Sequence, residues 1–364
     1  MAVDGNFLFY NSPVVTSDGV NEYVVYLTSD GKVVIKKNII INLSNFFNKS
    51  ATEEYVVHDY NSVINYNRGS ADDHAAPSVI YDDVNDRIVI ATAYHGSPLY
   101  IYQFKEGKFK KIKKINGRYT YPRLFKSRGV VNLLARLQPE GIKGGDFVFR
   151  TSSDNFTSEE TVVKSSDGHV VYASAPAILD DKVYFQYSMH SYAENRLIGW
   201  NVLRWNILTN KINSCDLSSL LPAEYESNRP TGINVNLKNI IITTSFFDKK
   251  NHKKIADNFN RNNVVYIVKM DTIDMENGKC GTDIIHKGTA KAPYYHTSVA
   301  VSDNLDWIYF NNNKYVSNNR YMNCFNHEGM MYPNFYKDNI YFATQNLKYS
   351  IRSFKNSIFG CKKL

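Results

Sequence analysis

The sequence predicts an all-β protein, built as a seven-bladed β-propeller of four-stranded antiparallel blades. Three observations predict this fold: short strand-like runs recur along the chain, turn residues separate them, and helical periodicity is nearly absent. A β-sandwich is the alternative, because it also uses many short strands. No linker rich in Pro, Gly or Ser interrupts the 364 residues, so we expect a single domain over residues 1–364.

Runs of alternating or continuous apolar residues mark the expected strands. The clearest runs are Glu22–Leu27, Arg87–Tyr94, Leu99–Phe104, Val130–Leu137, Asp146–Arg150, Lys182–Tyr187, Gly199–Ile207, Asn239–Thr244, Val264–Met270, Trp307–Asn311 and Asn339–Ala343. Polar turns such as Ser29-Asp30-Gly31 and Leu179-Asp180-Asp181 separate them. Short helices are expected only around Leu217–Tyr225 and His252–Phe259.

A weak repeat organises these strands. Each unit begins with a turn of small residues or proline, and a strand, an Asp-rich turn and a second strand follow. Units begin at His74–Pro77, Tyr121–Arg123, Ala173–Pro176, His296–Ser298 and Tyr332–Pro333. The spacing of roughly 45–60 residues is close to one four-stranded blade, so the chain has room for about seven.

Charge and composition narrow the class of partner. Lys and Arg exceed Asp and Glu by 43 to 35, a net charge of +8, which favours a polyanionic partner. The basic run Lys105–Lys114 alternates with apolar residues and is typical of a solvated strand edge, and no nucleic-acid-binding motif accompanies it. The 27 Tyr, 20 Phe and many Asn residues suit sugar binding, although a large β core also uses aromatic residues. We therefore expect an acidic polysaccharide partner and no nucleic acid.

The cysteines and the chain ends give less information about the fold and the location of the protein. Cys215, Cys280, Cys324 and Cys361 lie far apart with no CxxC pair, so their spacing predicts neither a disulfide framework nor a zinc finger. No ligand motif supports a structural zinc or calcium, and no cofactor is expected. No apolar run approaches 18 residues, so no membrane insertion is expected. Met1–Asp4 does not resemble a signal peptide, and we expect an extracellular protein whose leader is absent, or a virion component.

Histidine, tyrosine and arginine recur where the strand pairs begin and end. His74 is followed by His95, Tyr121 by Arg136, and Tyr172 by His190. Loops at corresponding ends of successive blades meet near the axis of a propeller, so these side chains are expected to share one site. Arg136 lies in an apolar strand, where burial of its charge requires an anionic partner from the protein or a ligand.

This pattern resembles the BNR-type β-propeller polysaccharide lyases, best known as ulvan lyases. The resemblance rests on Asp72-Asp73-His74 with Pro77, on His95-Gly96, on Tyr121-Pro122 followed by Arg136, and on a degenerate box at Thr151–Thr157. It covers roughly residues 70–210 well. It implies a seven-bladed propeller that cleaves a uronic-acid-containing polysaccharide by β-elimination and leaves a 4,5-unsaturated uronate end.

The resemblance also implies roles for individual residues. His74 and His95 match the paired active-site histidines, Tyr121 the catalytic tyrosine, and Arg136 the arginine that neutralises the carboxylate. Tyr172 and His190 match further substrate-contacting positions. We add two substrate-binding candidates: Arg123, which follows Tyr121-Pro122, and His296, which begins a unit as His74 does. Ala75 and Gly96 stand where the family often has Asn, which leaves the exact substrate open.

These residue types suit β-elimination. The proton at C5 is acidic enough only if a cation holds the adjacent carboxylate, and Arg136 can do so bidentately. Neutral imidazole at His74 or His95 is a suitable base, and the Tyr121 phenol can protonate the departing O4 or act as the base itself.

Two other functions remain open. A sialidase-like glycoside hydrolase would use several arginines around one carboxylate, and Arg68, Arg123, Arg136 and Arg150 are available. A non-catalytic carbohydrate-binding or attachment propeller would explain the Tyr and Asn content, but it has no need of two histidines beside an arginine. The remaining histidines, including His58, lie in polar or turn contexts and are assigned to surface or structural positions.

Overall fold

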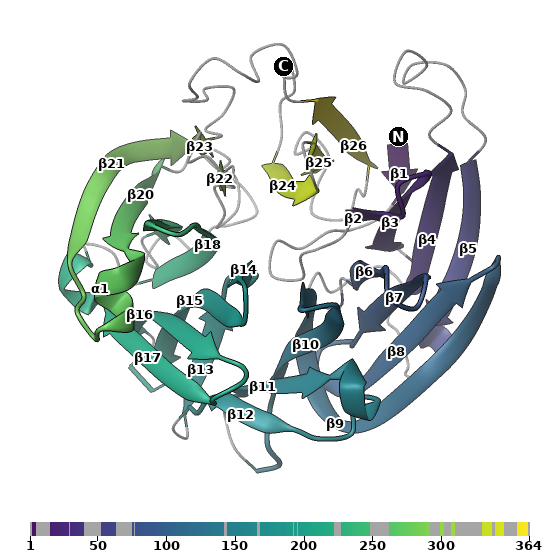
Figure 1. Ribbon diagram of the computed structural model, residues 1–364, viewed down its shortest axis with the longest axis horizontal. Coiled ribbons are helices and arrows are strands. Elements are labelled where there is room, and N and C mark those ends of the chain that lie inside the picture. Colours follow the sequence, from purple (N-terminus) through teal and green to yellow (C-terminus); the bar gives the residue numbers. More distant parts are fainter. Residues whose placement is uncertain are drawn as a thin grey trace. The chain divides into compact units, whose positions relative to one another are not determined.

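In the computed structural model, the described residues form antiparallel β-sheets almost throughout (Figure 1). The described ranges are 2–4, 15–28, 30–39, 52–62, 75, 77–141, 144–165, 168–191, 193–194, 196–221, 227–247, 262–291, 299–301, 307–309, 330–336, 339–345 and 355–362. The chain divides into two compact units. The first comprises residues 1–141, 146–164 and 341–359, and the second comprises residues 142–145, 165–340 and 360–364.

The first unit contains two sheets whose strands follow chain order. The four-stranded sheet consists of β2 (Val15–Ser17), β3 (Asn21–Leu27), β4 (Lys32–Ile39) and β5 (Thr52–Asp59). The seven-stranded sheet consists of β6 (Ser78–Asp82), β7 (Arg87–Thr92), β8 (Ser97–Lys105), β9 (Lys108–Ser127), β10 (Val130–Leu137), β11 (Asp146–Thr151) and β12 (Glu160–Val163). Every neighbouring pair of strands in these two sheets is antiparallel.

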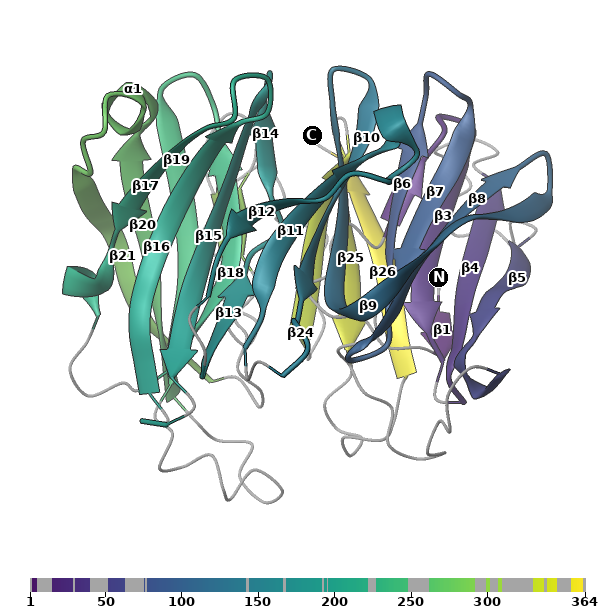
Figure 2. The same ribbon diagram turned by 90° about the horizontal axis from the view of Figure 1, so that it is seen from below.

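Strand β9 is long and serves two groups of strands (Figure 2). Its first half, from Lys108, pairs with β8, and its second half, up to Ser127, pairs with β10. The seven-stranded sheet is therefore two four-stranded groups, β6–β9 and β9–β12, that share one strand. The candidate residues Tyr121 and Arg136 both belong to the second group. Tyr121 lies in the second half of β9, and Arg136 lies in β10.

The second unit contains three further groups of paired strands. Strands β15 (Lys182–Ser191), β16 (Arg196–Asn206) and β17 (Lys211–Asp216) form a sheet with β13 (His169–Ala173) and the short β14 (Ala177–Leu179), both of which pair with β15. A second sheet consists of β18 (Ser227–Val235), β19 (Asn239–Phe247), β20 (Asn262–Asp271) and β21 (Thr282–Lys291). Strand β22 (Val299–Val301) pairs with β23 (Trp307–Tyr309).

The remaining strands come from the two ends of the chain. They are β1 (Ala2–Asp4), β24 (Met330–Tyr336), β25 (Asn339–Gln345) and β26 (Lys355–Lys362). Ala2, Val3 and Asp4 of β1 pair with Ser357, Asn356 and Lys355 of β26 in antiparallel register. The N-terminal strand thus completes a sheet with residues from the C-terminal end.

The strand predictions are confirmed wherever the structure describes the residues. Val130–Leu137 is β10 with the same bounds, because the turn Arg128-Gly129 precedes its apolar run. The helix predictions are tested less fully. The described part of Leu217–Tyr225, which ends at Leu221, contains a 3₁₀ turn at Ser218–Leu220, and residues 222–225 and 252–259 lie outside the described residues. A short helix, α1 (Thr272–Glu276), was not predicted, although Asp271 caps it by accepting hydrogen bonds from the amides of Ile273 and Asp274.

Apolar side chains pack into separate cores on the two faces of the strands around β8. One core joins β3–β5 to β6–β8 and includes Val25, Ile35, Ile90 and Tyr100. The other lies against the opposite face, between β7–β8 and β9–β11, and includes Leu99, Ile101, Leu124, Leu133 and Val148. The second unit has its own core around Trp200 and Ile242. No helix among the described residues is long and apolar enough to cross a membrane.

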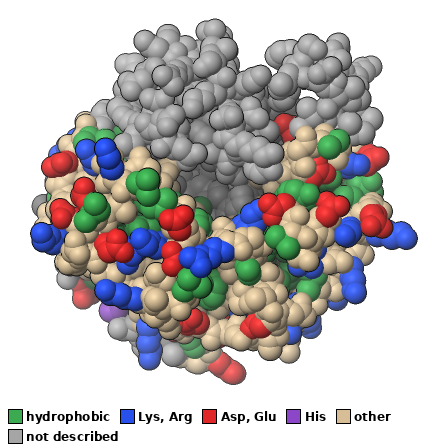
Figure 3. Space-filling view, viewed as in Figure 1, with side chains coloured by type: hydrophobic (Ala, Val, Ile, Leu, Met, Phe, Trp, Pro, Cys, Tyr) green, Lys and Arg blue, Asp and Glu red, His purple; other side chains and the backbone are tan. Residues whose placement is uncertain are grey.

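The first half of β9 carries the predicted basic edge. Lys108, Lys110, Lys111 and Lys114 are exposed, and in the described register this half pairs with β8 alone. Lysines on an unpaired edge oppose the addition of another strand, so this edge has a structural explanation. Elsewhere on the described surface shown in Figure 3, Lys and Arg are interspersed with acidic side chains.

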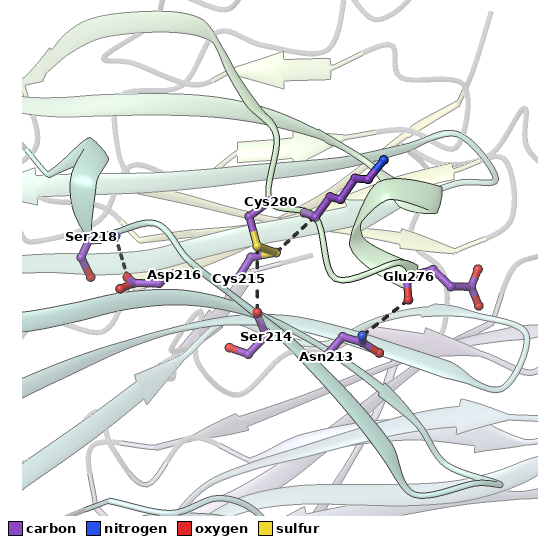
Figure 4. Close-up of a disulfide and its surroundings, with 8 residues drawn as sticks. Asn213, Ser214, Cys215, Asp216, Ser218, Glu276 and Cys280 are labelled. Atoms are coloured by element: carbon purple, nitrogen blue, oxygen red, sulfur yellow. Dashed lines mark hydrogen bonds between the residues drawn. A yellow bond between two sulfur atoms is a disulfide. The ribbon is translucent and has the colours of Figure 1, made fainter.

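A disulfide links Cys215 to Cys280, a pairing that the cysteine spacing did not predict (Figure 4). Cys215 is the next-to-last residue of β17 and lies in the core, and Cys280 follows α1, with a Cα–Cα distance of 5.4 Å. Sixty-five residues separate the two cysteines, so only the pairing of strands in the second unit brings them together. Each sulfur also contacts a backbone carbonyl, that of Lys279 or Ser214.

His58 is buried, with 8% of its surface exposed, so of the two predicted positions, surface or structural, it takes the structural one. Its Nδ1 lies 2.7 Å from the Tyr102 hydroxyl, and its ring packs 4.6 Å from Tyr60 and 4.4 Å from Tyr100, centroid to centroid. Burial, and secondarily the charge of Lys111, lowers the pKa of His58 to about 4. The imidazole is therefore neutral in the folded protein at neutral pH.

This lowered pKa predicts acid sensitivity. Below its ordinary value of 6.5, His58 binds a proton in the unfolded chain but not in the folded one, so stability falls as pH drops from 6.5 towards 4. We expect a loss on the order of 2–3 kcal/mol over this range. Urea unfolding across the range, compared with His58→Gln, measures the effect. An equal pH slope in both proteins would contradict it.

Candidate active site

Tyr121 lies at a β-bulge between β9 and β10. Thr120 pairs with Arg136, and Arg123 pairs with Leu134, so Tyr121 and Pro122 together oppose Ala135. The extra residue is accommodated by Tyr121, whose φ of 56° is in the left-handed region that bulky residues rarely adopt. The predicted Tyr-Pro turn is thus a bulge within a strand. Strained backbone of this kind is concentrated at functional sites.

The Arg136 side chain packs on the Tyr121 ring. The guanidinium carbon of Arg136 lies 4.6 Å from the ring centroid of Tyr121, and only 6% of Arg136 is exposed. Tyr121 itself is fully buried. A guanidinium on an aromatic face retains its charge and is held in a fixed plane. The structure therefore brings together the predicted tyrosine and the predicted arginine.

Arg123 lies on the same face of the sheet as Arg136. Its partner Leu134 is two residues from Arg136, and alternate residues of a strand share a face. The Arg123 guanidinium packs 5.0 Å from the ring centroid of Phe147, which is the β11 partner of Arg136. Arg123 is fully buried. This face therefore carries two buried arginines beside Tyr121, opposite the core built around Leu124.

His95 projects from the turn between β7 and β8, and this turn is tied to β9. The Ser97 amide donates to the Tyr94 carbonyl across the turn, and Gly96 takes the left-handed conformation with φ of 74°. The Gly96 amide donates to the Tyr119 carbonyl at 3.0 Å and approaches Thr120 Oγ1 at 3.3 Å. Because Thr120 pairs with Arg136, these bonds place the exposed His95 beside the strand positions of Tyr121 and Arg136.

The neighbouring Tyr119 has a different environment. Its hydroxyl donates to Glu159 at 2.8 Å and accepts from Arg150 at 2.9 Å, on the face opposite Arg136. Burial raises the pKa of Tyr119 to about 12. Arg150 also donates to the carbonyls of Phe156, Thr157 and Ser158, so this network holds the loop after β11. Tyr119 therefore has a structural role, and it provides a control for Tyr121.

The degenerate box at Thr151–Thr157 forms a structural turn. Ser152–Asp154 is a short 3₁₀ helix, followed by Asn155 and Phe156 in the left-handed conformation. The Asp154 carboxylate accepts the amides of Thr157 and Ser158, and the Phe156 ring is buried in the core. The box therefore stabilises a loop, and its described residues add no group to the site.

Tyr172 and His190 form a pair in the second unit. Tyr172 on β13 and His190 on β15 meet edge to face, with ring centroids 5.3 Å apart. His190 is buried, and its Nε2 lies 3.4 Å from the Ser188 hydroxyl. The structure thus brings these two predicted residues together. His74 and His296 lie outside the described residues.

Sequence reasoning missed Arg118 and Thr120. Thr120 joins the His95 turn to the strand of Tyr121, and the Arg118 guanidinium lies beside Gly96 of that turn. The sequence signal for both residues is their spacing of two positions, which places Arg118 and Thr120 on one face of β9. Within the described ranges, no group of three or more His, Cys, Asp or Glu side chains could hold a metal ion.

Comparisons with known proteins find solved structures that are similar to this chain but no matching sequence family. No protein-family model matches the sequence, and no curated protein matches it. The chain is similar in structure to a PL25 polysaccharide lyase, an ulvan lyase, with a TM-score of 0.66 and 12% sequence identity over 100% of this chain and 96% of that one.

Two further solved structures are similar over nearly the whole chain. The PL25 ulvan lyase bound to -[GlcA(1-4)Rha3S]- has a TM-score of 0.62 and 11% identity, covering 100% of this chain and 84% of the other. Polysaccharide lyase Uly1 has a TM-score of 0.58 and 10% identity, covering 99% and 92%. The protein therefore has a fold like that of the polysaccharide lyases.

Proposed function

We propose that this protein is a polysaccharide lyase that cleaves a uronate-containing acidic polysaccharide by β-elimination. One observation carries the proposal: the buried Arg136 guanidinium packs on Tyr121 at a strained bulge, and the His95 turn is bonded to the residues just before that bulge. A cation, a phenol and an imidazole are the groups that this reaction needs. The similarity in fold to polysaccharide lyases supports it.

The proposed reaction assigns each group one task. Arg136 holds the uronate carboxylate and stabilises the enolate that forms when the C5 proton leaves. His95, with His74 as the other candidate, accepts that proton. The C4–O4 bond breaks as the C4=C5 double bond forms, and Tyr121 donates a proton to O4. Tyr121 is an alternative base. Tyr172, His190, Arg123 and His296 are proposed to contact other sugars of the substrate.

The grouping of strands supports a seven-bladed propeller as a single domain. Dividing the seven-stranded sheet at β9 gives the groups β2–β5, β6–β9, β9–β12, β13–β17, β18–β21 and β22–β23. The seventh group consists of β24, β25 and β26 with β1, which pairs with β26. We propose that these groups are the seven blades. These successive groups of strands account for the weak repeat seen in the sequence.

We also propose that the protein acts outside the cell. The Cys215–Cys280 disulfide supports this location, because disulfides persist in oxidising compartments and are rare in the cytosol of mesophiles. A virion-associated location is compatible with the same chemistry. The net charge of +8 favours an acidic polymer as substrate, and raised salt should weaken its binding.

Absorbance near 232 nm tests the reaction directly. Only elimination creates the conjugated 4,5-unsaturated uronate that absorbs there, so we expect a rise with one member of a panel of uronate polymers. Ulvan, glucuronan, gum arabic, glycosaminoglycans and bacterial capsules form the panel. If absorbance near 232 nm rises with none of these polymers, the proposal is contradicted.

The panel also separates the alternative functions. Arg118, Arg123 and Arg136 share one face with Tyr121, which is the observation that favours a sialidase-like hydrolase as the second candidate. New reducing ends without absorbance at 232 nm would identify a hydrolase. Binding without either product would identify a carbohydrate-binding protein.

Tyr121→Phe tests the role of the phenol. We expect this change to lower kcat by about 10²-fold or more, because a positioned acid or base contributes about 10²–10⁴-fold. The ring and its contact with Arg136 remain, so the protein should stay folded. Tyr119→Phe is the matched control: it removes a buried phenol from the opposite face, and its kcat should remain within about twofold. Equal kcat values for the two variants would remove Tyr121 from the mechanism.

A further inference from the structure

Tyr60 contacts the end of β7, from which the His95 turn begins, although it comes from another sheet. It begins the short 3₁₀ helix Tyr60–Ser62 directly after β5, and its side chain is fully buried. Its amide donates to the Gly31 carbonyl at 3.0 Å, in the turn between β3 and β4. The four-stranded sheet therefore fixes the backbone of Tyr60, while its side chain reaches across to the seven-stranded sheet.

The Tyr60 side chain contacts this strand end at two points. Its hydroxyl lies 2.6 Å from Oγ1 of Thr92, the last residue of β7, in a buried hydrogen bond that either group can donate. Its ring packs against the ring of Tyr94, with centroids 5.5 Å apart. Thr92 and Tyr94 are alternate residues on one face, and Ala93 between them packs in the core on the opposite face. One polar and one aromatic contact thus hold the strand end immediately before His95.

The His95 turn is therefore held at both of its ends. At its far end, Gly96 is bonded to β9 as described above, and the Ser97 hydroxyl accepts from the Tyr94 amide at 2.8 Å. At its near end, Tyr60 holds the last residues of the strand. His95 itself is exposed, so its imidazole takes its position from the backbone of the turn rather than from a surrounding core.

The core around Tyr60 also includes the segment of the second predicted histidine. Ala75, which follows His74 in the sequence, is fully buried and belongs to the same core as Tyr60 and Ile90. Tyr94, which precedes His95, packs against this core as well. Residues next to both predicted histidines thus pack into one core, of which Tyr60 is a member.

We infer that Tyr60 is a positioning residue for His95, and that it holds the turn of this histidine in place beside Tyr121. This inference rests on the proposed function and adds to it a residue from outside the strands of the site. Burial raises the pKa of the Tyr60 phenol above its ordinary value of 10, so the hydroxyl acts through its bond to Thr92 and not as a base. The contact matters for the rate because a small displacement of a base from the bond that it attacks is costly.

Tyr60→Phe tests the inference, because it removes the hydroxyl and keeps the ring. We expect kcat on a uronate polymer to fall about tenfold with KM within twofold, since a displaced base impairs proton transfer more than binding. Tyr102→Phe is the matched control: it removes another buried hydroxyl of the same core, one that lies 2.7 Å from Nδ1 of His58. Its Tm should fall by a similar amount, but its kcat should stay within twofold of wild type. Equal losses of kcat in the two variants would show that Tyr60 is merely structural.

Thr92→Val tests the same bond from its other end. If the two hydroxyl groups act as a unit, Thr92→Val, Tyr60→Phe and the double variant should share one value of kcat within about twofold. Losses that multiply in the double variant would overturn the role of this hydrogen bond.

Amide hydrogen exchange tests Tyr60 without turnover. The Gly96 and Ser97 amides donate to the carbonyls of Tyr119 and Tyr94, so they report local opening of the turn. We expect both amides to exchange about tenfold faster in Tyr60→Phe than in wild type or Tyr102→Phe, measured by NMR without substrate. If absorbance near 232 nm never rises, the lyase proposal fails, and these exchange rates alone decide whether Tyr60 holds the turn. Equal exchange in Tyr60→Phe and wild type would overturn the inference.

Discussion

Replacing Arg136 with methionine should lower kcat on a uronate polymer by at least about 10³-fold while the protein remains folded. Methionine fills most of the space of the arginine stem but has no charge to hold the substrate carboxylate. Without that cation, removal of the C5 proton would place a second negative charge beside the first. The loss should therefore fall on kcat more than on KM, since the interaction is strongest in the transition state.

Arg136→Lys separates charge from geometry. Lysine keeps a positive charge but lacks the planar fork that packs on the Tyr121 ring, so we expect partial activity, between methionine and wild type. Circular dichroism and thermal unfolding verify that both variants are folded. Full activity of the folded Arg136→Met protein would eliminate this residue as the group that neutralises the carboxylate.

Removing the disulfide should produce the largest loss of stability. Closing a loop of 65 residues contributes about 4 kcal/mol in the chain-entropy treatment, so Cys215→Ala combined with Cys280→Ser should lower Tm by roughly 5 °C. Alanine suits the buried position of Cys215, and serine suits the exposed position of Cys280. The bond lies in the second unit, so activity measured well below Tm should be retained if Arg136 and Tyr121 perform the chemistry.

Reducing the disulfide chemically is an independent test of its contribution to Tm. Dithiothreitol should lower the Tm of the wild-type protein to that of the double variant and should leave the variant unaffected. Labelling of thiols in the denatured, unreduced protein gives the same information chemically, because bridged cysteines do not react. Identical Tm values for wild type and variant would show that the bond does not form in solution.

Strands could be predicted from the sequence because their signal is local. Val130–Leu137 is apolar and flanked by a turn, and these features are enough to define β10. The bulge at Tyr121 could not be predicted in the same way. A left-handed conformation at a tyrosine is enforced by the register of β10, and no nearby glycine indicates it.

Long-range contacts account for the other differences. Cys215 and Cys280 are 65 residues apart, so their spacing carries no information about pairing. His58 follows an ordinary polar pattern, but the tyrosines that bury it belong mainly to β8, more than forty residues later. For the site, the sequence predicted that Tyr121, Arg136 and His95 share one site. It did not indicate the bonds from Gly96 to β9 that hold the His95 turn at that strand.

The bulge at Tyr121 has a consequence for how such a site can arise and be lost in evolution. In a hairpin without the extra residue, the residue opposite Ala135 would point into the core around Leu124, away from Arg136. Deleting one codon at Pro122 would thus turn the phenol inward while leaving the pairs on either side intact. A duplicated group of strands can carry the same pairing and the same tyrosine, and yet only a copy with the one-residue insertion turns that tyrosine to the face of Arg136.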